Sequence, residues 1–209
     1  MDKQLKTGTT TVGIVCKMGV VLAADMRATA GTMIVDKRAE KVQIMSDDFA
    51  LTWAGNVSDA QLMTRLARAE LKLKEVRTGK PPSTKEAANL LAGLQYSSIR
   101  RPSMLPGIAH FLLGGRDAHG VHLYDLFPDG SVTKITDYVS SGSGSVFAYG
   151  VLETNYDANL SIEQGVQLAV KVINTALQRD SASGNGINVV VVSAEGVKKV
   201  MTKELIAKL

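Results

Sequence analysis

Short runs rich in apolar and β-branched residues alternate with turn-forming residues through the first part of the chain. The runs are residues 10–16, 20–25, 41–45 and 49–54. Two of the breaks between them read Lys17-Met18-Gly19 and Ser46-Asp47-Asp48, and glycine, aspartate and serine are typical of tight turns. Runs of this length between turn residues favour β-strands. We therefore predict that strands come before the first helix.

Three later segments have the spacing or the capping residues of helices. Residues 83–100 begin with Ser83 and Glu86 at the spacing of a capping box, in which each side chain accepts a free backbone N–H of the other residue. Residues 161–178 begin in the same way, with Ser161 and Gln164. Residues 58–76 are predicted to be helical because their large apolar residues recur at helical spacing. These residues are Leu62, Leu66, Leu73 and Val76.

Further strands are predicted around the third helix. They are residues 108–114, 121–127, 131–136, 187–193 and 198–202, with Asp129-Gly130 as a hairpin turn. Residues 189–192 are all valine, so we expect that strand to be buried on both faces. Strands on either side of a helix pair predict one α/β domain, a four-layer αββα sandwich of two mainly antiparallel sheets between helix layers.

The composition narrows the class of protein. Of the 209 residues, 45% are hydrophobic and 21% charged, which is ordinary for a globular domain. The net charge of +4 could favour nucleic acid, but acidic residues are interspersed with the basic ones and aromatics are only 5%. The densest basic stretch, residues 65–80, has helical spacing and contains Glu70 and Glu75. We interpret it as a solvated helix face and predict no nucleic-acid partner.

The compartment can also be predicted. No run approaches the roughly 18 apolar residues of a membrane span. The first residues are polar and lack the apolar centre of a secretory signal. A single cysteine, Cys16, cannot form an internal disulfide, which suits a reducing compartment. We therefore expect a cytoplasmic protein without a membrane partner.

The usual catalytic motifs are missing from the sequence. His110 and His122 fall within predicted strands and His119 at the turn between them, so we interpret all three as structural or surface residues. Neither the histidines nor the acidic residues have the spacing of metal ligands, and no metal or cofactor is predicted. The Ser/Gly run at residues 141–145 is by itself more typical of a tight turn. An enzyme built from this chain needs another base.

The threonine cluster near the amino terminus offers that base. Thr7, Thr9, Thr10 and Thr11 surround Gly8. A threonine hydroxyl needs an adjacent base to become a nucleophile, and a free α-amine has a pKa of about 7.7–8, close to neutral pH. Cleavage of the Gly8–Thr9 bond would give Thr9 both groups, making residues 1–8 a propeptide. Thr10 and Thr11 are expected to be plain strand residues.

From Thr9 onward the chain strongly resembles the mature start of proteasome β subunits, especially those of archaea. The resemblance covers residues 9–205 and is carried by motifs in the right order along the chain. They are TTTVGIVCKMGVVLAADMRATAG at 9–31, AEKVQI at 39–44, TWAGNVSDAQ at 52–61, SGSGSVFAYGVLE at 141–153 and RDSASG at 179–184.

The resemblance implies a threonine protease with the N-terminal nucleophile hydrolase fold, in which residues 9–209 form a single catalytic domain. Thr9 matches the nucleophile, and Asp25 and Lys41 match the acidic and basic residues that hold it. An ammonium close to the Thr9 hydroxyl would favour the developing alkoxide and lower the pKa of the neighbouring amine. Asp25 would keep Lys41 charged.

Four further site residues follow from the same resemblance. Gly55 matches the oxyanion-hole donor, which acts through its backbone N–H. Ser143 matches a residue that hydrogen-bonds the amine of the nucleophile, and Asp180 and Ser183 match supporting residues beneath it. Turn formation is the alternative interpretation of Asp180 and Ser183.

The implied substrates are unfolded polypeptides bound as an added strand. Thr29 and Val57 match positions that line this strand, and the first side-chain pocket matches Ala28, Ala39, Gln43 and Trp53. A bulky indole in that pocket predicts cleavage after small or medium apolar residues. The alternative is that Trp53 swings aside and changes little.

The implied assembly is a seven-membered β ring, two of which stack between two rings of α subunits, fed by an ATP-driven unfoldase. A second interpretation is a non-catalytic or conditionally processed structural subunit of the β ring. The presence of Thr9, Asp25 and Lys41 together disfavours it. A third, an N-terminal nucleophile amidase acting on a small molecule, would lack the RATAG and SGSGSVFAYG motifs.

Overall fold

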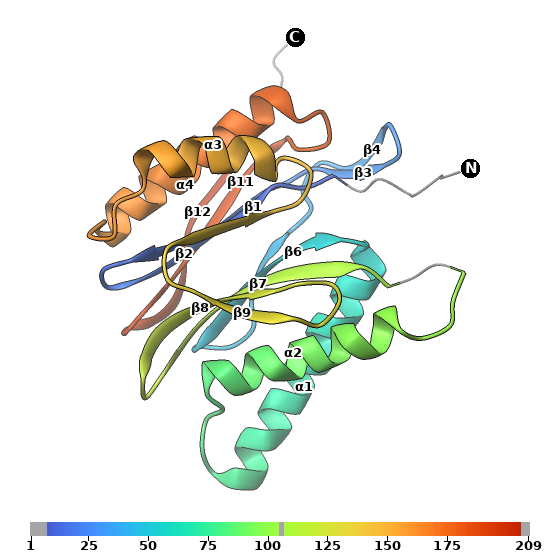
Figure 1. Cartoon of the computed structure of the whole chain (residues 1–209), viewed down its shortest axis with the longest axis vertical. Helices are drawn as coiled ribbons and strands as arrows, with labels where there is room; N and C mark the ends of the chain where they lie inside the picture. Colours follow the sequence, from blue (N-terminus) through green and yellow to red (C-terminus); the bar gives the residue numbers. More distant parts are fainter. Residues whose placement is uncertain (1–7, 105–106, 206–209) are drawn as a thin grey trace.

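Two five-stranded antiparallel sheets form the centre of the computed structural model, which describes residues 8–104 and 107–205 (Figure 1). The first sheet has the order β10-β1-β2-β11-β12. Its strands are β1 (Thr11–Cys16), β2 (Gly19–Asp25), β10 (Tyr138–Ser141), β11 (Gly186–Ser193) and β12 (Gly196–Glu204). The second has the order β5-β6-β7-β8-β9. Its strands are β5 (Val42–Ile44), β6 (Phe49–Gly55), β7 (Ala109–Asp117), β8 (Gly120–Leu126) and β9 (Val132–Ile135).

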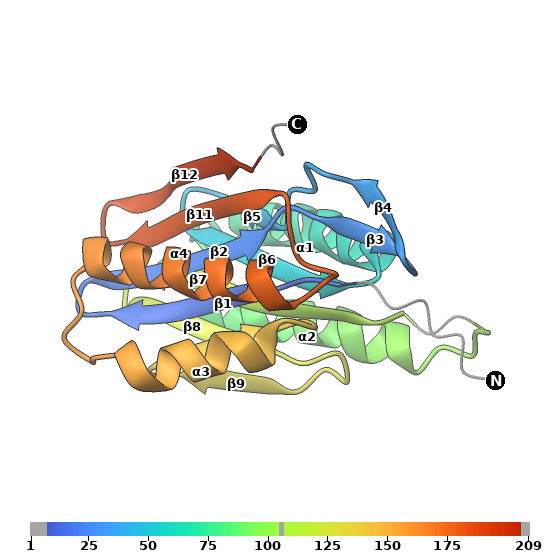
Figure 2. The same cartoon turned by 90° about the horizontal axis from the view of Figure 1, so that it is seen from above.

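Helix pairs cover the outer faces of both sheets. Helices α3 (Ser145–Asn155) and α4 (Ile162–Arg179) lie on the first sheet, and α1 (Val57–Thr78) and α2 (Thr84–Ile99) lie on the second (Figures 1 and 2). A small ribbon of β3 (Ala28–Ala30) and β4 (Met33–Asp36) stands beside them. This arrangement confirms the predicted αββα sandwich.

The core has three apolar layers, and the strand sequences explain them. Alternate residues of a strand point to opposite faces of its sheet. In β11, Val190 and Val192 pack between the two sheets, whereas Val189 and Val191 pack under α3 and α4. The prediction that this valine run is buried on both sides is confirmed.

Both predicted capping boxes are present. The Ser83 side chain accepts the Glu86 N–H, and the Glu86 carboxylate accepts the Ser83 N–H. Ser161 and Gln164 exchange the same pair of bonds at the start of α4. The predicted turn at Asp129-Gly130 also forms, with Gly130 in a left-handed conformation of φ 89°. These local signals determine where the elements begin.

The face of α1 that packs against the core is not the face that carries its large apolar residues. Leu62 and Leu66 are 49% and 43% exposed, and Val76 is 70% exposed. The buried face consists mainly of smaller residues, Ala60, Met63, Thr64, Ala67 and Leu71. Small side chains let the helix backbone approach its neighbours closely, so the leucine spacing identifies the helix without identifying its core face.

Four elements were not predicted from the sequence. They are β3, β4, β10 and α3. The Ser/Gly run at residues 141–145, interpreted as a turn, connects the end of β10 to the start of α3. Within the described ranges, no helix is both long and apolar enough to cross a membrane.

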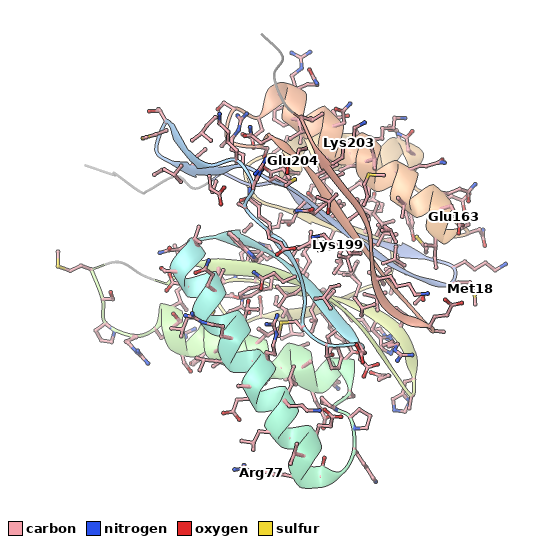
Figure 3. The ribbon with its side chains drawn as sticks, turned by 180° about the vertical axis from the view of Figure 1, so that it is seen from behind. Met18, Arg77, Glu163, Lys199, Lys203 and Glu204 are labelled. Atoms are coloured by element: carbon pink, nitrogen blue, oxygen red, sulfur yellow. The ribbon has the colours of Figure 1, made fainter. Side chains whose placement is uncertain are left out.

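Several charged residues on the surface form ion pairs, as expected of a solvated surface. Lys199 and Glu204 lie along β12 (Figure 3). Lys199 contacts Glu40 at 2.7 Å, and Glu204 contacts Arg38 at 3.0 Å. On α1, Lys72 contacts Glu75 at 2.9 Å. Basic side chains on these faces therefore have acidic neighbours.

Candidate active site

Thr9 lies at the end of the first sheet, two residues before β1 begins, and is buried. Its hydroxyl donates a hydrogen bond of 2.5 Å to the carbonyl oxygen of Gly8. The Gly8 N–H in turn donates to Thr29 Oγ1 on β3 at 3.1 Å. Both the N–H and the carbonyl group of Gly8 thus form hydrogen bonds, and the Thr9 hydroxyl lies next to the carbonyl of the bond predicted to be cleaved.

Asp25 and Lys41 meet directly beneath this bond. Asp25 ends β2, and Lys41 precedes β5. Lys41 Nζ lies 2.8 Å from Asp25 Oδ1 and also donates to the Gly8 carbonyl oxygen at 3.3 Å. Both side chains are buried, Lys41 with only 1% of its side chain exposed. Lys41 therefore connects the carboxylate to the carbonyl that Thr9 contacts.

The Asp25 carboxylate is enclosed by backbone donors. Its Oδ1 accepts the Thr10 N–H at 3.0 Å, and its Oδ2 accepts the N–H groups of Arg27 and Gly184 at 3.0 and 2.9 Å. A buried charge is tolerated when hydrogen bonds replace its lost solvation. These donors and Lys41 together hold the carboxylate in one orientation.

Burial lowers the pKa of the Lys41 ammonium from its ordinary value, because the charged form loses its solvation. Asp25 opposes this effect by charge and by a hydrogen bond but does not cancel it. The expectation that Asp25 simply keeps Lys41 charged is therefore incomplete. Lys41 releases a proton more readily than an exposed lysine.

Ser143, Asp180 and Ser183 form a hydrogen-bonded group on the other side of Thr9. The Thr9 N–H donates to Ser143 Oγ at 3.2 Å. The hydroxyls of Ser143 and Ser183 both donate to Asp180 Oδ2 at 2.6 Å. The three residues that the resemblance placed around the nitrogen of Thr9 are thus brought together there.

Gly142 shows why the Ser/Gly run contains glycine at this point. Its φ of 93° favours glycine, and a Cβ atom there would lie 2.0 Å from the carbonyl oxygen of Thr9. The absence of a side chain allows this segment to approach Thr9 closely. Ser143 reaches the Thr9 nitrogen because of this approach.

Gly55 ends β6, with a φ of 117°, and is followed by Asn56, the N-cap of α1. A Cβ atom at Gly55 would lie 2.4 Å from the carbonyl oxygen of Ile108. The two hydrogen bonds described for the Gly8 carbonyl oxygen come from Thr9 and Lys41, and Gly55 is not among its donors. The oxyanion role of the Gly55 N–H stays a prediction.

Trp53 is fixed in place. It is 3% exposed and packs in the core layer beneath α1 and α2. Its backbone N–H donates to the Lys41 carbonyl at 3.0 Å, and its indole Nε1–H donates to the Glu40 carbonyl at 3.3 Å. These contacts disfavour the alternative in which the indole swings aside.

The remaining residues predicted for the substrate strand and pocket lie on neighbouring elements. Ala28 and Thr29 are in β3, Gln43 in β5, and Val57 begins α1. Ala39 donates its N–H to the Met26 carbonyl, which joins its loop to the segment after β2. Their contact with a substrate stays a prediction.

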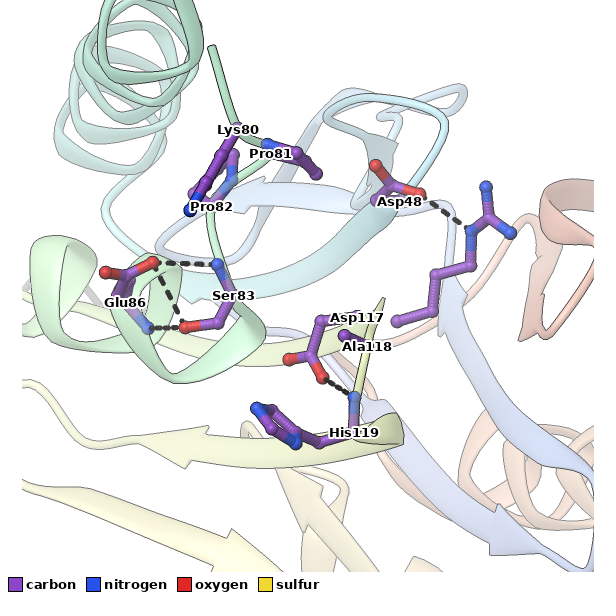
Figure 4. A pocket seen from close by; sticks show the side chains of 10 residues that line it. Asp48, Lys80, Pro81, Pro82, Ser83, Glu86, Asp117, Ala118 and His119 are labelled. Atoms are coloured by element: carbon purple, nitrogen blue, oxygen red, sulfur yellow. Dashed lines mark hydrogen bonds and ion pairs between the residues drawn. The ribbon is translucent and has the colours of Figure 1, made fainter. Parts of the chain in front are cut away.

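A surface cavity of about 580 Å³ is formed between the α1–α2 connection and the β7–β8 turn, with Lys80, Pro82, Glu86 and His119 in its lining (Figure 4). Its lining contains none of the predicted site residues. Within the described part of the chain, no group of three or more His, Cys, Asp or Glu side chains could hold a metal ion.

Comparison with known proteins identifies the family of the chain. The model of the proteasome subunit family matches residues 5–192. The chain belongs to the proteasome subunit family. Relatives named proteasome subunit beta include one from Methanocaldococcus vulcanius, 44% identical over 95% of this chain and 87% of that protein. Another, from Ferroglobus placidus, is 42% identical over 98% of this chain and 95% of that protein.

A third relative, from Archaeoglobus fulgidus, is 40% identical over 93% of this chain and 90% of its own length. The resemblance to archaeal proteasome β subunits is thereby confirmed. As a β subunit of the 20S proteasome, the chain has a protease-type role and is part of a multi-subunit particle.

Two further residues join the network without having been predicted. Thr10, expected to be a plain strand residue, shares a 2.7 Å hydrogen bond with Ser183 Oγ and donates its N–H to Asp25. Arg27 donates through Nε to Asn185 Oδ1 at 2.8 Å and through Nη1 to the Ser181 carbonyl at 2.8 Å. Arg27 is visible in the sequence within the RATAG motif, but its side chain contacts residues more than 150 positions away.

Proposed function

We propose that this β subunit is a threonine-type endopeptidase that frees its own nucleophile by cleaving the Gly8–Thr9 bond. The observation that carries the proposal is the contact of Thr9 Oγ1 with the Gly8 carbonyl at 2.5 Å, while Lys41 donates to the same oxygen at 3.3 Å. A hydroxyl, a carbonyl and a buried lysine of lowered pKa therefore meet at one peptide bond.

In the proposed self-cleavage, Thr9 Oγ bonds to the Gly8 carbonyl carbon and the C–N bond to Thr9 breaks. The hydroxyl proton passes by way of Lys41 to the departing nitrogen. Water then hydrolyses the resulting ester, leaving a carboxylate on Gly8 and a free amine on Thr9. Residues 1–8 are thus the propeptide and residues 9–209 the catalytic domain.

Hydrolysis of a substrate peptide repeats this chemistry with the free Thr9 amine as base. The amine takes the hydroxyl proton as Thr9 Oγ attacks and passes it to the leaving nitrogen; water then removes the acyl group. Ser143, backed by Asp180 and Ser183, orients the amine, and Asp25 holds Lys41. The Gly55 N–H stabilises the tetrahedral oxyanion. No metal or other cofactor takes part.

The partners in this proposal are unfolded polypeptides, other β subunits in a seven-membered ring, two flanking rings of α subunits and an ATP-driven unfoldase, in the cytoplasm. A protease that binds the peptide backbone of its substrate has little selectivity, so enclosing its active sites within stacked rings would protect other proteins. Thr29 and Val57 line the bound strand, and Ala28, Ala39, Gln43 and Trp53 surround its first side chain.

The test is the intact mass of the chain, expressed alone and with a matching α subunit. We expect loss of residues 1–8 at least in the presence of the α subunit, together with hydrolysis of fluorogenic peptides. A full-length mass under both conditions, without peptide hydrolysis, would instead support the alternative of a structural ring subunit. Processing only beside the α subunit would identify conditional maturation.

Trp53 provides a prediction of specificity. Because the buried indole is held by the Glu40 carbonyl, it should shorten the pocket for the residue before the cut. We expect faster hydrolysis of fluorogenic peptides ending in Ala or Leu than of those ending in Tyr. Trp53→Met should move the preference toward Tyr, since Met is narrower and more flexible. Fastest turnover of the Tyr peptide by the wild-type protein would contradict this prediction.

A further inference from the structure

His110 connects the two sheets at the end of the sandwich that carries Thr9. Its Nδ1 lies 2.7 Å from Ser141 Oγ, and its Nε2 lies 2.5 Å from Asp125 Oδ1. His110 and Asp125 are on β7 and β8 of the second sheet, whereas Ser141 is the last residue of β10 in the first. The ring edge also packs against Phe127, with a centroid distance of 4.7 Å.

The carboxylate of Asp125 determines the hydrogen-bonding role of one ring nitrogen of His110. An ionised carboxylate only accepts hydrogen bonds, so Asp125 requires the hydrogen to be on Nε2 of His110. The other ring nitrogen, Nδ1, is paired with the hydroxyl of Ser141, which can donate or accept a hydrogen bond. Both ring nitrogens are therefore used, and the Ser141 side chain is held in one orientation.

Ser141 is two residues from the group that contacts the Thr9 nitrogen. It pairs with Thr11 across β10 and β1, and it is followed by Gly142, which lies against the Thr9 carbonyl. Ser143 then accepts the Thr9 N–H at 3.2 Å. A displacement of Ser141 would be passed along this short segment to Ser143.

The backbone of His110 is also close, in strand register, to the second part of the proposed site. In the register of β6 and β7, His110 is opposite Ala54, and Ala109 is opposite Gly55. The imidazole therefore joins the strand next to the predicted oxyanion donor to the segment that holds the nucleophile's nitrogen.

We propose that His110 is a positioning residue: through Ser141 it holds Ser143 in register with Thr9. The proposal rests on the proposed function, because it concerns the same reaction. Although serine, histidine and aspartate are together here, Ser141 is only 4% exposed and closes a strand pair. A substrate acyl group does not reach a hydroxyl in that position, so the group supports the site and is not a second nucleophile.

The experiment compares His110→Leu with His110→Gln in the β subunit assembled with its α subunit. Leucine removes both hydrogen bonds, whereas the glutamine amide can accept from Ser141 and donate to Asp125. For His110→Leu we expect the rate of loss of residues 1–8 and kcat for peptides to fall about tenfold, because a small displacement of reacting groups is costly. KM should stay within about twofold, since substrate binding is not altered. His110→Gln should restore both rates.

Ser141→Ala tests the path of the effect. It should reproduce the loss seen for His110→Leu, and the double variant should be no slower than either, because both changes break one chain of contacts. His122→Leu is the matched control: His122 is a half-buried histidine on β8, 3.6 Å from Asp117, outside this group. It should leave both rates unchanged, and thermal unfolding of each variant should show that the fold is retained.

Several results would overturn the positioning role. They are wild-type rates in His110→Leu, equal losses in His122→Leu, additive losses in the double variant, and labelling of Ser141 by a fluorophosphonate. If the wild-type protein keeps residues 1–8 and hydrolyses no peptide, the proposed function fails and this inference with it. Wild-type processing combined with an unaffected His110→Leu variant rejects this inference alone.

Discussion

Replacing Thr9 with alanine should abolish both the release of residues 1–8 and the hydrolysis of peptides. In the structure the Thr9 hydroxyl is the group in contact with the Gly8 carbonyl, and its removal takes away the proposed nucleophile. Loss of a nucleophile costs at least about 10³-fold in kcat even when the rest of a site is intact. Intact mass and a fluorogenic peptide assay on the assembled particle measure the two activities.

Two companion variants make this result specific. Thr9→Ser keeps a hydroxyl at the same atom and should still release residues 1–8, at a reduced rate because the side chain loses the methyl group that restricts its rotation. Thr11→Val is the matched control, since Thr11 is also buried and the contact described for its hydroxyl is a long one of 3.5 Å to the Ser141 carbonyl. It should process and cleave normally. Self-cleavage by Thr9→Ala would refute the assignment of the nucleophile.

Much of the fold follows from local signals in the sequence. The capping boxes at Ser83 and Ser161 begin helices where predicted, and the valine run of β11 is buried on both faces. The ribbon of β3 and β4 could not be predicted in this way, because its strands are only three and four residues long. Helix α3 begins at the last residue of the Ser/Gly run, and its N-cap, Gly144, makes no side-chain hydrogen bond.

The residue types in the sequence predict only part of the candidate active site. A threonine after a glycine suggests a self-released nucleophile, but Asp25 and Lys41 are ordinary charged residues until the fold buries them together. Their roles were inferred from a family resemblance. Thr10 shows the limit of that inference, because its hydroxyl contacts Ser183, 173 positions away. Such a contact depends on sheet order, which no local pattern encodes.

His110, interpreted from the sequence as a structural or surface residue, also has a contact that no local pattern predicts. Its contact with Ser141 crosses from one sheet to the other. The sequence places His110 in a strand but does not indicate which residue of the opposite sheet it meets. The packing of the two sheets through their shared apolar layer determines that partner.

Replacing Lys41 with methionine should reduce self-cleavage and kcat at least about hundredfold, which is the usual contribution of a proton-transferring group. Methionine has a similar length and no charge, so it fills the buried space while removing the contacts with Asp25 and Gly8. Asp25 keeps three backbone N–H donors, so the variant should fold. Mass spectra of samples quenched at successive times measure the rate of self-cleavage, and steady-state hydrolysis of a fluorogenic peptide measures kcat.

Lys41→Arg separates proton transfer from charge alone. A guanidinium keeps its proton at every accessible pH. If Lys41 exchanges a proton during the reaction, as its lowered pKa favours, arginine should be nearly as slow as methionine. Wild-type rates in Lys41→Arg would show that a fixed positive charge is sufficient and would reject the proton-carrying role.

The pH dependence of stability gives an independent test of the Lys41 environment. Burial lowers the pKa of Lys41 in the folded protein below the ordinary 10.5. At any pH between the folded and the unfolded pKa, Lys41 therefore binds more protons in the unfolded chain than in the folded chain. The free energy of unfolding of the wild-type protein, relative to Lys41→Met, should therefore rise as the pH increases from the lowered folded value toward 10.5. Denaturant unfolding of both proteins across that interval measures the difference. A falling difference would mean that Asp25 outweighs burial and raises the pKa of Lys41, which would leave the ammonium as a fixed charge in the site.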